Sequence, residues 1–179
     1  MRNVYILGMV LLSVAMLATT MPSTLMANVE TTSIDYHSMV CVYKNNELVE
    51  CSHNALTNAG KEAIEDLIGA GTAGAAFDYI ALGNGSTPSA GSTSLDEEIG
   101  DSGLERAQGT VNQVAGGSSG NWSVTNTFTA TGAVGSINTT SLFNNSFPTN
   151  ISMFAYNTFT EVSLQAQDQI NVTWTIWVT

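Results

Sequence analysis

The sequence predicts an all-β protein: a single β-sandwich with jelly-roll-like connections, one short helix and an extended N-terminal tail. Short apolar runs recur along the chain at roughly eight-to-twelve-residue spacing, separated by Gly, Ser, Thr and Asn turn signals. Charged residues make up 11% of the chain, and so few charges are typical of a β domain with long polar loops. In the C-terminal residues 169–178, apolar side chains at every second position alternate with Asn171, Thr173, Thr175 and Trp177.

This C-terminal segment is the strongest strand in the sequence. Period-two alternation is the pattern of a half-buried strand. A strand that is so apolar on one face must be covered by other parts of the chain, so we expect the C-terminus to be a core element. The apolar set is Ile170, Val172, Trp174, Ile176 and Val178.

Residues 1–27 have the pattern of a secretory signal peptide. Arg2 precedes an apolar run over 4–18, and Pro22 and small residues lead to Ala27. This order of charge, apolar run and small residues is that of a cleaved leader. The alternative, a membrane anchor, is disfavoured because the run is shorter than the roughly 20 residues that span a bilayer. We therefore expect secretion, with no membrane association once the leader is removed.

The mature chain is expected to begin with a tail over 28–40, followed by the sandwich domain over 41–179. The first part of this tail is polar. In its second part Ile34, Tyr36 and Val40 fall on one face of an extended segment. The tail therefore ends as a strand that leads into the domain.

Asn45 and Asn46 predict a hairpin turn, because Asn tolerates positive φ. A three-residue loop over 45–47 places Cys41 opposite Cys51, whereas a two-residue loop places Cys41 opposite Glu50. Two cysteines that face each other in a secreted domain predict a disulfide. Free thiols or a metal pair are the alternatives, but zinc needs four ligands and the chain has no second Cys pair.

Residues 57–68 form the one convincing helix. Thr57 or Asn58 can cap its N-terminus, and Gly69 is placed to end it in the left-handed conformation. About ten residues are too few for an isolated helix, so we expect it to pack on one end or edge of the sheets. Its apolar stripe is Ile64, Leu67 and Ile68.

The remaining elements are short strands joined by polar loops. Strands are expected over 77–82, 110–114, 122–130, 134–137, 151–159 and 162–164, with loops over 83–94, 115–120 and 142–148.

The charge distribution excludes two classes of partner. The formal net charge is -11, and after leader cleavage the cationic side chains other than histidine are Lys44, Lys61 and Arg106. Nucleic-acid binding needs a basic patch that releases counterions from phosphate, and three scattered cations do not make one. The same deficit disfavours anionic membranes.

Two motif matches lack the context that their chemistry requires. Residues 116–120 satisfy G-x-S-x-G, but both histidines, His37 and His53, precede the motif and no helix is expected after it. Residues 69–74 satisfy G-x-G-x-x-G, but they follow a helix and precede a strand, the reverse of a dinucleotide site. We therefore expect no enzyme activity and no cofactor.

One acidic segment, over 95–105, concentrates carboxylates. Calcium prefers six to eight oxygen ligands, and a Gly-containing acidic loop can supply several. The spacing matches no EF-hand loop, so a solvated acidic loop is the commoner explanation. Paired-carboxylate glycosidase chemistry would also need an aromatic-lined cleft. The weak calcium candidates are Asp96, Glu97, Glu98 and Asp101.

The chain contains more Asn-x-Ser/Thr sequons than chance predicts. Because it is rich in Asn, Ser and Thr, roughly three would arise by chance. In a secreted protein some of them are expected to carry glycans. The candidates are Asn84, Asn121, Asn138, Asn144, Asn150 and Asn171.

Three stretches together resemble a known group of structural proteins. They are VYKNNELVECSHNALTNAGKEAIEDLIG, FDYIALGNGSTPSAGSTSLDEEI and SLFNNSFPTNISMFAYNTFTEVSLQAQDQINVTWTIWV. The combination resembles β-sandwich structural proteins of phage tails and virions, and it is similar to secreted archaeal filament subunits of the thread type. The resemblance covers nearly all of the mature chain.

The thread-type resemblance implies assembly by donor-strand complementation. The tail of each subunit, with Ile34, Tyr36 and Val40, would complete a groove in the sheet of its neighbour. The partner would be a second copy of the chain, in a head-to-tail homopolymer at the cell surface. The alternative is a secreted or virion-type β-sandwich that binds or adheres without polymerising. A hydrolase lacks a credible catalytic set.

Overall fold

The structure is a computed structural model that describes residues 35–70, 74–113, 121–147 and 153–179. The chain divides into two units, Met1–Ser33 and Ile34–Thr179. All of the described residues lie in the second unit. The predicted leader and Ile34 lie outside the described residues.

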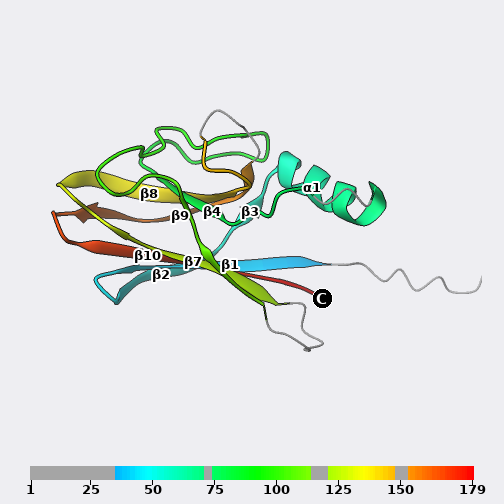
Figure 1. The fold of residues 1–179 in the computed structure, drawn as a ribbon, viewed down its shortest axis with the longest axis horizontal. Coiled ribbons are helices and arrows are strands. Elements are labelled where there is room, and N and C mark those ends of the chain that lie inside the picture. Colours follow the sequence, from blue (N-terminus) through cyan, green and yellow to red (C-terminus); the bar gives the residue numbers. More distant parts are fainter. Residues whose placement is uncertain (1–34, 71–73, 114–120, 148–152) are drawn as a thin grey trace, which may run out of the picture. The chain divides into compact units, whose positions relative to one another are not determined.

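Two five-stranded sheets face each other, which confirms the predicted β-sandwich (Figure 1). The first sheet, sheet A, has the order β2-β1-β10-β7-β6, and the second, sheet B, has the order β3-β9-β8-β4-β5. All strand pairs are antiparallel. The strands are β1 (Tyr36–Lys44), β2 (Glu47–His53), β3 (Ala55–Leu56), β4 (Tyr79–Gly83), β5 (Ala107–Gln108), β6 (Thr110–Gln113), β7 (Trp122–Thr129), β8 (Val134–Phe143), β9 (Met153–Leu164) and β10 (Gln169–Val178).

The C-terminal strand β10 lies at the centre of sheet A, as its alternation predicts. It pairs with β1 over nine residue pairs and with β7 over eight. Its inward side chains join the core that sheet B covers from the opposite side. Each buried apolar side chain of this size contributes about 1.5–3 kcal/mol. The buried set on β10 is Ile170, Val172, Trp174 and Ile176.

The β1–β2 hairpin has a two-residue turn, so the predicted three-residue loop is wrong. Asn45 and Asn46 have φ of 49° and 67°, the pair of positive values that a type I′ turn requires. The Asn45 side chain also bonds the neighbouring β9–β10 turn, because its amide donates to Asp168 Oδ1 at 2.9 Å and its Oδ1 accepts from Gln169 N at 2.8 Å. These contacts favour the tighter turn.

A β-bulge restores the cysteine register that a two-residue turn would otherwise shift. Tyr43 pairs with Leu48 and Val42 with Glu50, which leaves Val49 as the extra residue on β2. Beyond the bulge, Cys41 lies opposite Cys51. The two form the predicted disulfide, with a Cα–Cα distance of 4.1 Å.

Strands β8 and β9 are longer than the sequence pattern predicts. Leu142 belongs to β8 rather than to a connection, and β9 is one continuous strand where two segments were expected. The cause lies in buried hydroxyl residues that interrupt the apolar pattern. Thr140 and Ser141 are fully buried in β8, and Thr140 Oγ1 donates to Ala81 O at 2.9 Å.

The helix α1 (Asn58–Glu65) is capped by Thr57, as predicted, because the Thr57 hydroxyl accepts a bond from Gly60 N at 2.9 Å. Gly60 contacts β9 directly. A Cβ at this position would lie 2.1 Å from Phe154 O, so the close approach of helix and strand requires glycine.

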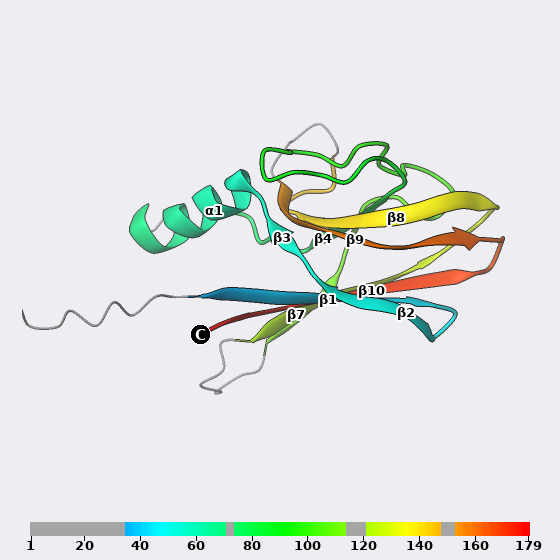
Figure 2. The same cartoon turned by 180° about the vertical axis from the view of Figure 1, so that it is seen from behind.

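The C-terminal part of the helix differs from the prediction. It continues as a π-helical segment η1 (Asp66–Ala70), and Gly69 does not take the left-handed conformation. Leu67 and Ile68 are 61% and 69% exposed. The helix therefore packs through its first turns, and its end extends away from the sandwich (Figure 2).

Glu50 connects the two sheets at their edge. Its Oε2 accepts bonds from Thr160 N at 2.7 Å and from Thr160 Oγ1 at 2.8 Å. Since Glu50 lies on β2 and Thr160 on β9, the carboxylate closes the sandwich on this side. These bonds to the charged form lower the pKa of Glu50 below its ordinary value.

Replacing Cys41 and Cys51 together by Ala should lower the free energy of unfolding. The disulfide joins residues ten apart, and closing a loop of this order constrains the unfolded chain by about 2–3 kcal/mol. Urea unfolding followed by circular dichroism measures the difference. Wild-type protein in reductant is the control and should behave like the variant. An unchanged midpoint would contradict the stabilising role.

Glu50→Gln should reduce the acid sensitivity of the fold. Because the folded-state pKa of Glu50 is lowered, the carboxylate stabilises the protein above the ordinary Glu pKa of about 4.3. This stability is lost as the pH falls through the lower folded-state pKa. The variant should therefore be less stable than wild type at pH 7 and lose less stability on acidification.

Glu47→Gln is the matched control for this measurement, since Glu47 is exposed on the same strand. Unfolding free energies are measured across the acidic range for all three proteins. If the curves of unfolding free energy against pH were parallel for wild type and Glu50→Gln, the Glu50 carboxylate would not contribute to the acid sensitivity.

Candidate functional site

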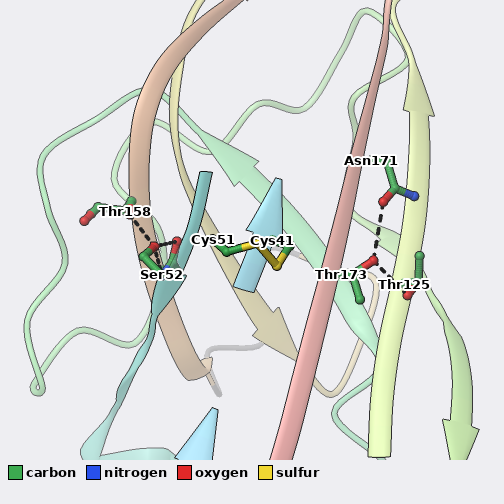
Figure 3. The surroundings of a disulfide bond; sticks show 8 residues. Cys41, Cys51, Ser52, Thr125, Thr158, Asn171 and Thr173 are labelled. Atoms are coloured by element: carbon green, nitrogen blue, oxygen red, sulfur yellow. Dashed lines mark hydrogen bonds between the residues drawn. A yellow bond between two sulfur atoms is a disulfide. The ribbon is translucent and has the colours of Figure 1, made fainter. Parts of the chain in front are cut away.

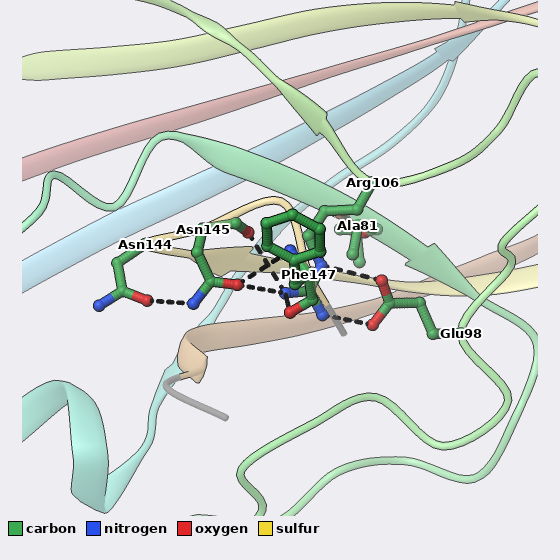
Figure 4. Close-up of polar contacts among 7 residues, drawn as sticks. Ala81, Glu98, Arg106, Asn144, Asn145 and Phe147 are labelled. Carbon is green, nitrogen blue, oxygen red and sulfur yellow. Dashed lines mark hydrogen bonds and ion pairs between the residues drawn. The ribbon is translucent and has the colours of Figure 1, made fainter. Parts of the chain in front are cut away.

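Glu98 of the acidic segment forms a buried ion pair with Arg106. Arg106 donates from Nη2 to Glu98 Oε2 at 2.6 Å and from Nε to Glu98 Oε1 at 2.9 Å, a two-pronged contact (Figure 4). The Arg106 side chain is only 2% exposed. Its guanidinium lies 3.5 Å from the centroid of the Phe143 ring and also donates to the backbone oxygens of Asn145 and Phe147. This contact set ties the acidic segment to the end of β8.

The other carboxylates of this segment do not converge on one point. Asp96 Oδ2 accepts bonds from Ser86 Oγ at 2.8 Å and Ser86 N at 3.3 Å, which lower the pKa of Asp96. Glu97 and Asp101 are exposed. Over the described residues, no group of three His, Cys, Asp or Glu side chains could hold a metal ion. An open hollow of about 510 Å³ lies beside Glu97, Glu98 and Asp101.

The predicted donor residues Tyr36 and Val40 lie in the sheet of their own subunit. Val40 pairs with Trp174 on β10 and with Ser52 on β2, and it is 1% exposed. Tyr36 pairs with Val178, and its ring packs against the core. The segment that could act as a donor strand for another subunit is therefore restricted to the residues before β1.

Parts of β9 and β4 in sheet B that extend beyond their short neighbours β3 and β5 are covered by other groups. The outer edge of β9 is capped by the Glu50 carboxylate at Thr160 N. The outer edge of β4 is lined by β5 and by the acidic segment, where Ile99 N donates to Leu82 O. Strands β2 and β6 end sheet A, and within the described residues β6 pairs with β7 alone. All four residues of β6 are exposed, whereas those of β2 are partly covered. Strand β6 also carries no charged side chain, the usual protection of an edge strand.

The outer face of sheet A carries a ladder of hydroxyl and amide side chains. Thr125 Oγ1 donates to Thr173 Oγ1 at 3.1 Å (Figure 3). Asn171 Nδ2 donates to Thr127 Oγ1 at 2.7 Å. Thr173 and Asn171 are joined in turn at 3.4 Å. The Cys41–Cys51 disulfide lies on the same outer face, since Cys41 pairs with Thr173.

Both histidines lie on this sheet at one end of the strands. The His37 ring stacks on Trp177, with centroids 5.7 Å apart and planes 15° apart, and His37 Nε2 lies 2.9 Å from Thr179 Oγ1. His53 Nδ1 lies 2.9 Å from Ser38 O. Their partners are thus a ring, a hydroxyl and a backbone oxygen.

A hollow of about 230 Å³, here called the amide hollow, lies where β6, β7 and β10 meet. Asn112, Ser123 and Thr175 form one row across these three strands, because Asn112 pairs with Ser123 and Ser123 with Thr175. Sequence reasoning missed this hollow. Its only signal was the run of uncharged polar residues on alternate positions of β7 and β10. Among the described residues, the lining is Asn112, Gln113, Asn121, Trp122, Ser123 and Thr175.

The sequons differ in accessibility. Asn84 is exposed, whereas Asn138 has its Oδ1 buried without a hydrogen-bond partner and donates from Nδ2 to Gly85 O. Asn144 is half-buried beside the Arg106 contacts, where its Oδ1 accepts a bond from the Asn145 amide. Asn121 lines the amide hollow and Asn171 belongs to the ladder. Asn150 and the G-x-S-x-G motif over 116–120 lie outside the described residues.

Comparison with known proteins finds no matching family model, no matching curated protein and no matching solved structure. Within the described part of the chain, no helix is long and apolar enough to cross a membrane.

Arg106→Met should destabilise the domain by about 3–5 kcal/mol, because it leaves the Glu98 carboxylate without its buried partner. Adding Glu98→Leu should recover part of this loss, since both charges are then gone. Chemical unfolding of the two single variants and the double variant measures the coupling. Additive losses would show that the pair acts as two independent groups.

Proposed function

We propose that the chain is a secreted structural subunit of an extracellular cell-surface filament, assembled by donor-strand complementation. The observation that carries this proposal is the open edge of β6, whose four residues are exposed, uncharged and paired on one side only. Such an edge presents free backbone donors and acceptors to another chain. Natural domains that remain monomeric usually protect such an edge.

The donor in this proposal is the segment before β1 of a neighbouring subunit. Strand β1 begins at Tyr36, and the donor that we propose is the preceding segment over 28–34, which follows the leader. An extended segment gains about 3.3 Å per residue, so seven residues are long enough to pair with all of β6. Strand addition provides main-chain hydrogen bonds and positions for alternate side chains. Because donor and acceptor are different surfaces, the contact does not close and produces a fibre.

Other features support an extracellular setting. The leader over 1–27 has the composition of a secretory signal, and the Cys41–Cys51 disulfide is typical of an oxidising compartment. Asn84, exposed in a loop, is the sequon that we propose to carry a glycan. The function requires no cofactor.

The alternative is a non-polymerising binding or adhesion module. The amide hollow favours it, because its lining offers polar groups to a ligand. The two functions share β6, because Asn112 and Gln113 line the hollow and belong to the strand proposed as the acceptor edge.

Deletion of residues 28–34, with the leader retained, should abolish fibres and leave folded monomers. The deletion removes the donor but spares β1 and its nine pairs with β10. Negative-stain microscopy and light scattering of the secreted protein measure assembly, and circular dichroism checks the fold. Fibres of unchanged length in the deletion variant would refute the proposal.

Val111→Lys tests the acceptor edge separately. Val111 is 40% exposed on β6, and an inward charge at an edge blocks strand addition. Leu48→Lys is the matched control, because Leu48 is 58% exposed on β2, the opposite edge strand of the same sheet. We expect Val111→Lys to prevent assembly and Leu48→Lys to permit it. The reverse result would assign the acceptor edge to β2.

A further inference from the structure

We propose that the amide hollow is a binding site for a neutral sugar unit of an oligosaccharide or polysaccharide. Its volume of about 230 Å³ is suited to a single pyranose ring and is too small for a folded peptide segment. Six residues from β6, β7, β10 and the residue before β7 line it. The inference does not depend on filament assembly.

The polar side chains of the hollow are free to bind a ligand. Asn112, Gln113, Asn121, Ser123 and Thr175 make no side-chain hydrogen bond to the described part of the chain. Their neighbours on the same face are bonded to one another, for example Thr125 to Thr173 at 3.1 Å. The ladder side chains are therefore bonded to one another, whereas the polar side chains of the hollow are exposed or half-buried and open to water.

The chemistry of these groups matches sugar hydroxyls. An amide offers two donors and a carbonyl oxygen, and a Ser or Thr hydroxyl both donates and accepts. Asn112, Ser123 and Thr175 place one amide and two hydroxyls on the outer face of sheet A, whereas Trp122 pairs with Ile176 and packs against the core. The outer face also carries an indole, that of Trp177, two residues along β10 from Thr175. An indole supplies an apolar surface against which the C–H face of a pyranose can pack.

The absence of charge selects a neutral ligand. Strands β6, β7 and β10 contain no Asp, Glu, Lys or Arg, although the whole chain carries a net charge of -11. An anionic ligand such as a phosphate would find no cation to pair with. A metal ion would find no carboxylate.

A second feature extends the site along β10. Trp177 lies two residues beyond Thr175 and on the same face, where it stacks with His37. This ring pair is half-buried. It can support a second sugar unit next to the one in the hollow, so we expect an oligosaccharide to bind more tightly than a monosaccharide.

The test is an NMR titration of the mature protein, produced without glycosylation. The probes are maltohexaose, cellohexaose, mannohexaose and xylohexaose, with oligogalacturonate as the acidic counterpart. We expect saturable shifts of the side-chain amide signals of Asn112, Gln113 and Asn121 with at least one neutral probe, and none with oligogalacturonate. No shift with any of the four neutral probes would overturn the proposal, as would equal binding of the acidic one.

Single-residue variants test where on the outer face of sheet A the saccharide binds. Asn112→Ala and Ser123→Ala should each raise Kd roughly three- to tenfold, the expected effect of one lost hydrogen bond. Thr129→Ala is the matched control, because Thr129 lies on β7 on the same face but bonds to Gln169 outside the hollow. Circular dichroism and thermal unfolding check that all three variants fold. Equal weakening by Thr129→Ala would place the binding elsewhere.

Mass spectrometry of the native secreted protein supplies an independent check. Asn121 lines the hollow and lies in a sequon. An unmodified Asn121 is expected. A glycan attached to Asn121 would itself fill the hollow and would overturn binding of a separate saccharide.

Discussion

The pairing of β10 between β1 and β7 is the constraint on which the rest of the domain depends. Its inward side chains, including Trp174, are buried against sheet B, whereas Thr173 and Thr175 face outward. Since a slip of one residue would exchange the two faces, the burial of Trp174 selects a single register. The core and the polar outer face are thus two consequences of one strand alignment. The amide hollow exists because the same alignment brings Thr175 beside Ser123 and Asn112.

Much of the fold could be predicted from local pattern, and the misses have physical causes. Strand β10 and the Thr57 cap could be predicted because each depends on residues that are close together in the sequence. The Cys41–Cys51 pairing was predicted through a loop of the wrong length. The correct route, a tight turn plus a bulge at Val49, depends on contacts from the β9–β10 turn, more than a hundred residues away. Strand β8 was predicted too short because its buried hydroxyl residues look like a loop.

The candidate sites were harder to predict, because each is assembled from distant segments. The acidic segment was recognisable by composition, but the role of Glu98 is set by Arg106, the cation that directly follows that segment. The amide hollow joins β6 to β10 across more than sixty residues of sequence. Nothing in the spacing of Asn112 and Thr175 indicates that they share a row. The exposed edge of β6 likewise follows from sheet order, which local pattern does not define.

The place where the chain enters the domain has a mechanical consequence. Asp35 and Thr179 exchange backbone bonds of 2.9 and 3.1 Å, so β1 starts beside the end of β10. A pull on the segment before Asp35 along the strand axis would load the β1–β10 hydrogen bonds together, in shear, instead of opening them one after another. The Cys41–Cys51 bond then passes the load from β1 to β2. Tension applied through the N-terminus would therefore be carried by three strands of sheet A, with a covalent link in the outer pair.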